Sequence, residues 1–143
     1  MSAPELVPIG TLSATLAGDL IMVPSGPKGA RIIAEVDRAV VEGDRLSATM
    51  MGRASADWAT VAPDGTYATL DVRMTLQTHD DAVLFVEYSG KIDFATGRAV
   101  SAPLVQTGDE RYDWLNRVQL LGDGTLNQET NELVYELYEV RPT

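Results

Sequence analysis

Strict alternation of polar and apolar residues over positions 67–77 is the feature that most restricts how this chain can fold. The even positions carry Ala68, Leu70, Val72, Met74 and Leu76, whereas the odd positions carry mainly polar side chains. Because successive side chains of a β-strand point to opposite faces, the segment is predicted to be a strand with one polar face. That face either meets water or lines a pocket.

The same period of two recurs along the chain, while helical periodicity is almost absent. Candidate strands cover residues 6–16, 31–41, 45–51, 67–77, 82–92, 102–107, 116–121 and 132–140. Residues typical of turns, such as Pro63-Asp64-Gly65 and Gly122-Asp123-Gly124, separate them. The pattern predicts an all-β, antiparallel barrel of about eight to ten strands. Residues 109–115 are predicted to form one short helical turn.

A closed barrel is favoured over an open sandwich because closure removes sheet edges that would otherwise pair with other molecules. With 143 residues, the chain is expected to form a single domain, residues 1–143, around one core. A barrel of about eight strands has an interior just large enough for side chains or one small ligand.

Composition narrows the range of partners. The chain has 11 basic and 21 acidic residues and a net charge of −10, which disfavours nucleic acid and anionic membrane surfaces. It has no cysteine and one histidine, His79, so a thiolate site, a Cys nucleophile or a multi-His metal centre is not expected. We therefore expect a small-molecule ligand and no metal or cofactor. No membrane-spanning run or secretory signal is evident, which predicts a cytoplasmic protein.

Several short motifs occur in a fixed order along the chain. They are Gly29-Ala30-Arg31, Ala56-Asp57-Trp58, Asp64-Gly65, Asp71-Val72-Arg73 and Tyr112-Asp113-Trp114-Leu115-Asn116. In this order and spacing the chain resembles the bacterial family DUF3237, over residues 5–140. The resemblance implies a calycin-like antiparallel barrel with a cavity, often assembled as a homo-oligomer. It also implies that some members act as cofactor-free enzymes on small carbonyl compounds.

The first candidate site combines Asp57 and Trp58 with Arg73. A buried guanidinium needs a carboxylate partner, and Asp57, Asp71 and Glu87 are the candidates. In the functional interpretation Asp57 is a general base and Arg73 stabilises a developing oxyanion. In the structural alternative the pair ties two strands together.

The second candidate site is the aromatic segment that begins at Tyr112. Tyr112 is a candidate phenolic acid, Trp114 together with Trp58 would hold an apolar substrate, and Asn116 would orient a carbonyl. The alternative is a cluster that packs a loop onto the barrel rim. Residues 78–81, which include His79, are predicted to form a solvated turn rather than a metal site.

Three functions remain open from the sequence. The leading hypothesis is a cofactor-independent lyase or isomerase that abstracts a proton next to a carbonyl, or that adds or removes water across an α,β-unsaturated carbonyl. The first alternative is a non-catalytic barrel that binds a small apolar ligand, which predicts a mostly apolar lumen with no titratable group at its base. The second is an oligomerisation module in which Asp71 and Arg73 bond across a subunit interface.

Overall fold

The computed structural model describes residues 2–27 and 29–143, and strands make up most of this length. The strands are β1 (Glu5–Leu16), β2 (Ile21–Gly26), β3 (Gly29–Glu42), β4 (Ala48–Met50), β5 (Ala56–Val61), β6 (Tyr67–Thr78), β7 (Val83–Asp93), β8 (Arg98–Ser101), β9 (Leu104–Gln106), β10 (Gln119–Asn127) and β11 (Glu132–Arg141). A 3₁₀ turn, η1 (Glu110–Tyr112), runs into a one-turn helix, α1 (Asp113–Asn116). No helix among the described residues is long and apolar enough to cross a membrane.

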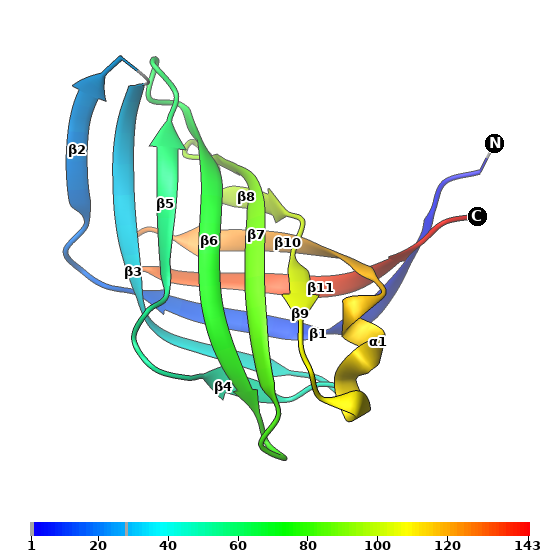
Figure 1. Cartoon of the computed structure of the whole chain (residues 1–143). Coiled ribbons are helices and arrows are strands. Elements are labelled where there is room, and N and C mark those ends of the chain that lie inside the picture. The colour runs from blue at the N-terminus through cyan, green and yellow to red at the C-terminus, as the bar shows by residue number, and fades with distance from the viewer. Residues whose placement is uncertain (1, 28) are drawn as a thin grey trace.

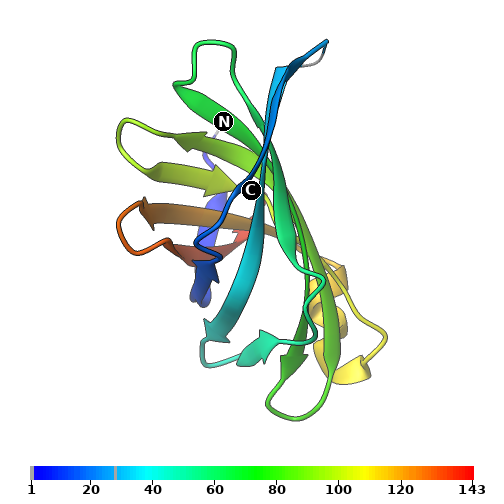
Figure 2. The same cartoon turned by 90° about the vertical axis from the view of Figure 1, so that its left-hand side faces the viewer.

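Eight of these strands close into an antiparallel barrel (Figure 1). The ring runs β6–β5–β3–β1–β11–β10–β8–β7, and pairing of β7 with β6 completes it. The predicted all-β barrel is therefore confirmed. The chain ends meet on one side, because Glu5 pairs with Arg141. Outside the ring, β2 extends β3 into a hairpin that projects beyond the barrel (Figure 2).

Alternation along β6 and β7 determines what fills the barrel. All five apolar side chains at the even positions 68–76 of β6 are buried, and so are those at positions 84, 86, 88 and 92 of β7. The odd positions of both strands face outward and are mostly exposed. The polar face predicted for residues 67–77 thus meets solvent and does not line the lumen.

The two ends of the barrel differ. At the end that holds the β6–β7 turn, the Tyr112 hydroxyl donates a hydrogen bond to Asp80, and Leu115 of α1 is buried in the core. The short helical turn predicted at residues 109–115 is present here as η1 and α1. The opposite end, near the start of β6 and the end of β7, leads to the lumen pocket described below.

The structure corrects the sequence prediction around β10. Gly122-Asp123-Gly124 was predicted to be a turn, yet it lies in the middle of a strand that pairs with both β8 and β11. Its glycines are needed because the Tyr135 ring covers this part of β10: a Cβ at position 124 would lie 2.5 Å from Cδ1 of Tyr135. Strands β2, β5 and β8 were not predicted, because they are short or lack clear alternation.

We expect Gly124→Ala to destabilise the fold by about 1–3 kcal/mol, because the added methyl group overlaps the buried Tyr135 ring. Urea denaturation measures the free energy of unfolding. Gly108→Ala is the matched control, since a Cβ there meets nothing within 4 Å, and we expect it to change stability by less than about 0.5 kcal/mol. Equal stability of the two variants would contradict the close contact.

Candidate functional site

Asp57 on β5 is directed into the barrel by strand register. It pairs with Ala34 of β3 on one side and with Val72 of β6 on the other, and both of these neighbours are buried inner-face residues. Val72 in turn pairs with Tyr88 of β7. Ala34, Asp57, Val72 and Tyr88 therefore form one row across the inner wall.

An apolar pocket of about 90 Å³ lies in the barrel beside this row, and Asp57 is the one charged residue among the described residues that line it. Of the residues that line it, Leu20 is exposed and four others are half-buried: Leu16, Ile32, Phe94 and Leu126. A small concave space with an apolar wall and one placed polar group is typical of a small-molecule site.

The surroundings of Asp57 make its carboxylate unusually basic. Burial raises the pKa of Asp57 to about 6, the hydrogen bond from the backbone N–H of Asp71 (2.9 Å) offsets part of this rise, and the negative charge of Asp71 adds to it. Within the described residues, no Lys or Arg forms an ion pair with Asp57. At neutral pH the group is mainly ionised, yet it is a stronger base than an exposed aspartate.

Two tyrosines are buried in the barrel interior, although neither is among the described residues that line the pocket. The rings of Tyr88 and Tyr135 meet edge to face, with centroids 5.7 Å apart. Burial raises the pKa of Tyr135 to about 12 and raises the pKa of Tyr88 well above its usual value, and the charge of Asp57 contributes to both shifts. Both phenols therefore stay protonated at neutral pH and can act as hydrogen-bond donors.

Arg73 lies on the opposite side of the wall from Asp57. Because Asp57 pairs with Val72, the cross-strand partner of Arg73 is Ala56, and the guanidinium points outward, where it stacks on the Trp58 ring at 4.7 Å. Asp71 and Glu87 are exposed on the same outer face. The prediction that Asp57 and Arg73 act on one enclosed substrate is therefore wrong within a single subunit.

Tyr112, Trp114 and Asn116 also lie away from Asp57, at the end of the barrel that holds the β6–β7 turn. The Tyr112 hydroxyl donates to Asp80 at 2.7 Å, which fixes η1 to that turn. Arg45 stacks on Trp114 at 3.8 Å, and the Asn116 amide bonds both backbone groups of Thr107. These contacts match the alternative in which the segment packs a loop onto the barrel rim.

Tyr88, Tyr135 and Ser101 were not predicted to be site residues, although all three are buried in the barrel. One signal was present: the glycines of Gly122-Asp123-Gly124 leave room beside a strand for a large inward side chain, and Tyr135 supplies it. Among the described residues, no group of three His, Asp or Glu side chains is placed to hold a metal ion, and His79 is exposed.

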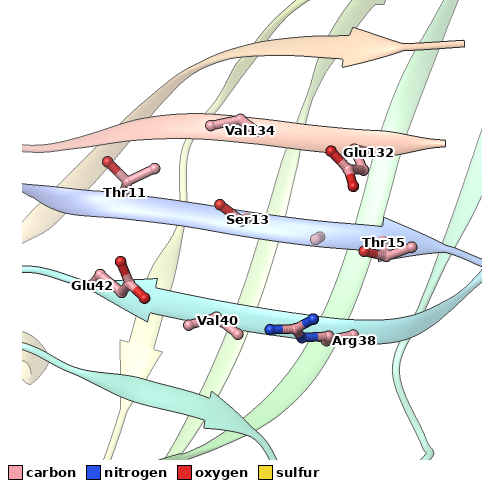
Figure 3. Close-up of a pocket in the computed structure, with 9 residues that line it drawn as sticks. Thr11, Ser13, Thr15, Arg38, Val40, Glu42, Glu132 and Val134 are labelled. Carbon is pink, nitrogen blue, oxygen red and sulfur yellow. The ribbon is translucent and has the colours of Figure 1, made fainter. Parts of the chain in front are cut away.

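A larger hollow, of about 230 Å³, lies on the outer face of β11, β1 and β3 (Figure 3). Thr11, Ser13 and Thr15 form its centre, with Glu132 on one side and Arg38 on the other. Its charged side chains are exposed to solvent, and the Thr11 hydroxyl already donates to Glu136 at 3.3 Å. These features are typical of a solvated polar surface. The lumen pocket, which contains a buried carboxylate, is therefore the candidate site.

Solved structures with the same fold include proteins described as having unknown function. A conserved protein from Rhodopseudomonas palustris superposes with a TM-score of 0.86 at 20% identity, covering 98% of this chain and 99% of its own. A β-barrel-like protein from Acinetobacter baumannii has a TM-score of 0.84 at 19% identity, covering 99% and 98%. An enzyme from Penicillium herquei has a TM-score of 0.75 at 23% identity, covering 99% and 97%. These likenesses concern the fold.

No curated protein sequence matches this chain. The sequence model of DUF3237, described as a protein of unknown function, matches residues 4–98 and 92–140, which is nearly the whole length. The resemblance found in the sequence motifs is thereby confirmed, and the chain belongs to the DUF3237 family.

Proposed function

We propose that this protein is a cofactor-independent lyase or isomerase that acts on a small carbonyl compound held in the barrel lumen. Asp57 is the general base that removes a proton from the carbon next to the carbonyl. The observation that carries the proposal is the Asp57 carboxylate itself, which faces an apolar pocket without an ion-pair partner among the described residues.

The chemistry of the pocket suits proton abstraction. A base with a pKa of about 6 is ionised at neutral pH and still holds a proton well, and such a positioned base contributes about 10²–10⁴ in rate. The apolar wall excludes water, which would otherwise solvate and weaken the carboxylate. The distant structural likeness to an enzyme is compatible with catalysis on this fold but assigns no reaction.

Removal of water from a β-hydroxy ketone illustrates the proposed step. Asp57 takes the proton from the carbon between the carbonyl and the carbinol carbon, and the electron pair of that C–H bond forms the new double bond. Hydroxide leaves the carbinol carbon and takes a proton from the Tyr88 hydroxyl, which gives water and an enone. Transfer of the Asp57 proton to Tyr88 restores the starting state. Tyr88 is thus proposed as the general acid, the role that was predicted for Tyr112.

A non-catalytic barrel for an apolar ligand is the second candidate, and the predominantly apolar lining favours it. A titratable group in the pocket counts against it, since Asp57 lowers affinity for a purely apolar ligand. Native mass spectrometry of freshly purified protein distinguishes the proposed enzyme from a non-catalytic binding protein. A bound apolar molecule that is recovered unchanged, together with no turnover of carbonyl compounds, would favour the binding protein.

We also propose that the protein is a homo-oligomer that uses the outer face of β5, β6 and β7. Trp58, Asp71, Arg73 and Glu87 lie on this face, and none of the three charged side chains forms a salt bridge among the described residues. Aromatic residues and Arg are enriched in protein interfaces.

The first prediction concerns the base. In an assay of 4-hydroxybutan-2-one dehydration, Asp57→Asn should lower kcat by about 10²-fold or more, because the amide cannot accept the proton. The Asn side-chain oxygen can still accept the hydrogen bond from the N–H of Asp71, so the fold should persist. Asp37→Asn, which removes an exposed carboxylate, is the matched control. Equal rates for wild type and Asp57→Asn would rule Asp57 out as the base.

The second prediction concerns stability and pH. Because the pKa of Asp57 is raised from 3.8 to about 6 in the folded state, ionisation of this group opposes folding as pH rises through that window. Asp57→Asn should therefore be more stable than wild type at pH 7.5, by up to about 3 kcal/mol, and the difference should shrink below pH 4. Urea denaturation across this range measures it. A constant difference would contradict the raised pKa.

The third prediction concerns assembly. If the outer face of β5–β7 is an interface, Arg73→Ala should shift the protein to a smaller species in size-exclusion chromatography with light scattering. Arg53→Ala, which removes another exposed cation, is the control. A wild-type protein that is monomeric at high concentration would refute the proposed oligomer.

A further inference from the structure

The hydrogen-bonded ladder between β5 and β6 is interrupted beside Asp57. The two strands pair at position 57 of β5 and again, in the same register, at position 60. Between these positions Trp58 and Ala59 have no paired residue on β6 among the described residues, although both pair with β3. The register places Trp58 opposite Asp71 and Ala59 opposite Leu70. Ala59 and Leu70 line the pocket that Asp57 also lines, so the interruption lies in the pocket wall.

Both backbone groups released by this interruption bond to side chains instead. Opposite residues of a hydrogen-bonded antiparallel pair exchange N–H···O bonds, so in an unbroken ladder the Asp71 N–H donates to the Trp58 carbonyl. Here the Asp71 N–H donates to Oδ1 of Asp57 at 2.9 Å, and the Trp58 carbonyl accepts from Nη1 of Arg31 at 3.1 Å. Because backbone groups left unpaired away from water cost free energy, each of these two bonds makes the other possible.

Arg31 reaches the Trp58 carbonyl from β3, along the outer face of the barrel. It pairs with Thr60 and its side chain is exposed, whereas Ile32, the next residue, lines the pocket on the inner face. A guanidinium keeps its charge at every pH at which Asp57 titrates, so this donor is not lost when the carboxylate changes charge. Arg31 forms no salt bridge among the described residues that would draw its guanidinium away from the carbonyl.

We propose that Arg31 is a positioning residue that holds the base of the proposed reaction in place. By occupying the Trp58 carbonyl, its guanidinium keeps the Asp71 N–H on Oδ1 of Asp57, which leaves Oδ2 to take the proton of the substrate. The inference rests on the proposed function, and Arg31 itself touches neither the substrate nor the reacting atoms. Without Arg31, closure of the ladder returns the Asp71 N–H to the Trp58 carbonyl and removes this donor from Asp57.

Other charged and titratable groups near Asp57 lie on the neighbouring strands. Tyr88 and Tyr135 are phenols in the barrel interior. The remaining groups are exposed on the outer face of β3, β6 and β7: Arg31, Glu35, Asp71, Arg73 and Glu87. The negative charge of Asp71 raises the pKa of Asp57, whereas the hydrogen bond from the Asp71 N–H lowers it. Loss of that hydrogen bond therefore raises the pKa of Asp57 further above its ordinary value.

Titration of Asp57 in Arg31→Ala tests the proposal. The carboxyl group of Asp57 is followed by ¹³C NMR in the full-length protein between pH 4 and pH 9, together with the ¹H shift of the Asp71 amide. Arg31→Ala should move the midpoint for Asp57 up by about one pH unit or more, which is the worth of one hydrogen bond to a charged group. The Asp71 amide should follow this titration in the wild type and lose that dependence in the variant, because its acceptor becomes the neutral Trp58 carbonyl.

Two controls separate the hydrogen bond from the loss of a positive charge. Arg38→Ala removes another exposed cation of β3 and should leave the midpoint for Asp57 unchanged. The rise in Arg31→Ala should persist in about 0.5 M NaCl, because salt screens exposed charges but does not restore a lost hydrogen bond. A rise that disappears in salt, or one that Arg38→Ala reproduces, would overturn the proposal.

Turnover reports on the proposed enzyme separately. In the dehydration of 4-hydroxybutan-2-one, Arg31→Ala should move the acidic limb of the kcat profile to higher pH by the same amount as the NMR midpoint. It should leave KM within about twofold, since Arg31 does not touch the substrate. The NMR response without turnover by the wild type would refute the proposed enzyme and still support the role of Arg31 in holding Asp57. If Arg31→Ala leaves either the Asp57 midpoint or the Asp71 amide unchanged, the inference is overturned whether or not the protein is an enzyme.

Discussion

The pairing register between β5 and β6 determines which charges this barrel hides. Asp57 faces Val72 across the strand pair, so the carboxylate enters the lumen while Arg73, one residue further along β6, must point outward. A shift of one residue would exchange the two faces, bury the guanidinium and expose the carboxylate. The other members of this row hold the register in place, because Ala34, Val72 and Tyr88 are all buried on the inner face.

Much of the fold was predictable because its long strands alternate strictly. Residues 67–77 correspond to β6 within one residue at its C-terminal end, and residues 132–140 correspond to β11 in the same way. Short strands were harder to predict, since β8 has four residues and β5 six, too few for a periodicity to stand out. The stretch at residues 122–124 was misread because glycine is common in turns, whereas here it makes room for an aromatic ring.

The candidate site was predictable only in part, for a related reason. Asp57 could be proposed from its residue type and motif. Alternation along one strand, however, does not show whether the odd or the even positions face inward, because that direction depends on how the strand pairs with its neighbours. Tyr88 and Tyr135 looked like ordinary strand residues, since nothing local distinguishes a tyrosine that faces the barrel interior from one that faces solvent. Their importance comes from pairing between distant segments: Tyr135 lies beside Gly124 on β10 and against Tyr88 on β7.

Two of the side chains that line the pocket, those of Leu20 and Phe94, lie outside the strands, unlike Asp57. Leu20 precedes β2 and Phe94 follows β7, whereas Asp57 is fixed by hydrogen-bonded pairing on both sides of β5. Loop residues tolerate substitution far better than paired strand residues do. Changes in bulk at positions 20 and 94 would therefore alter the size and shape of the pocket while Asp57 stays in place.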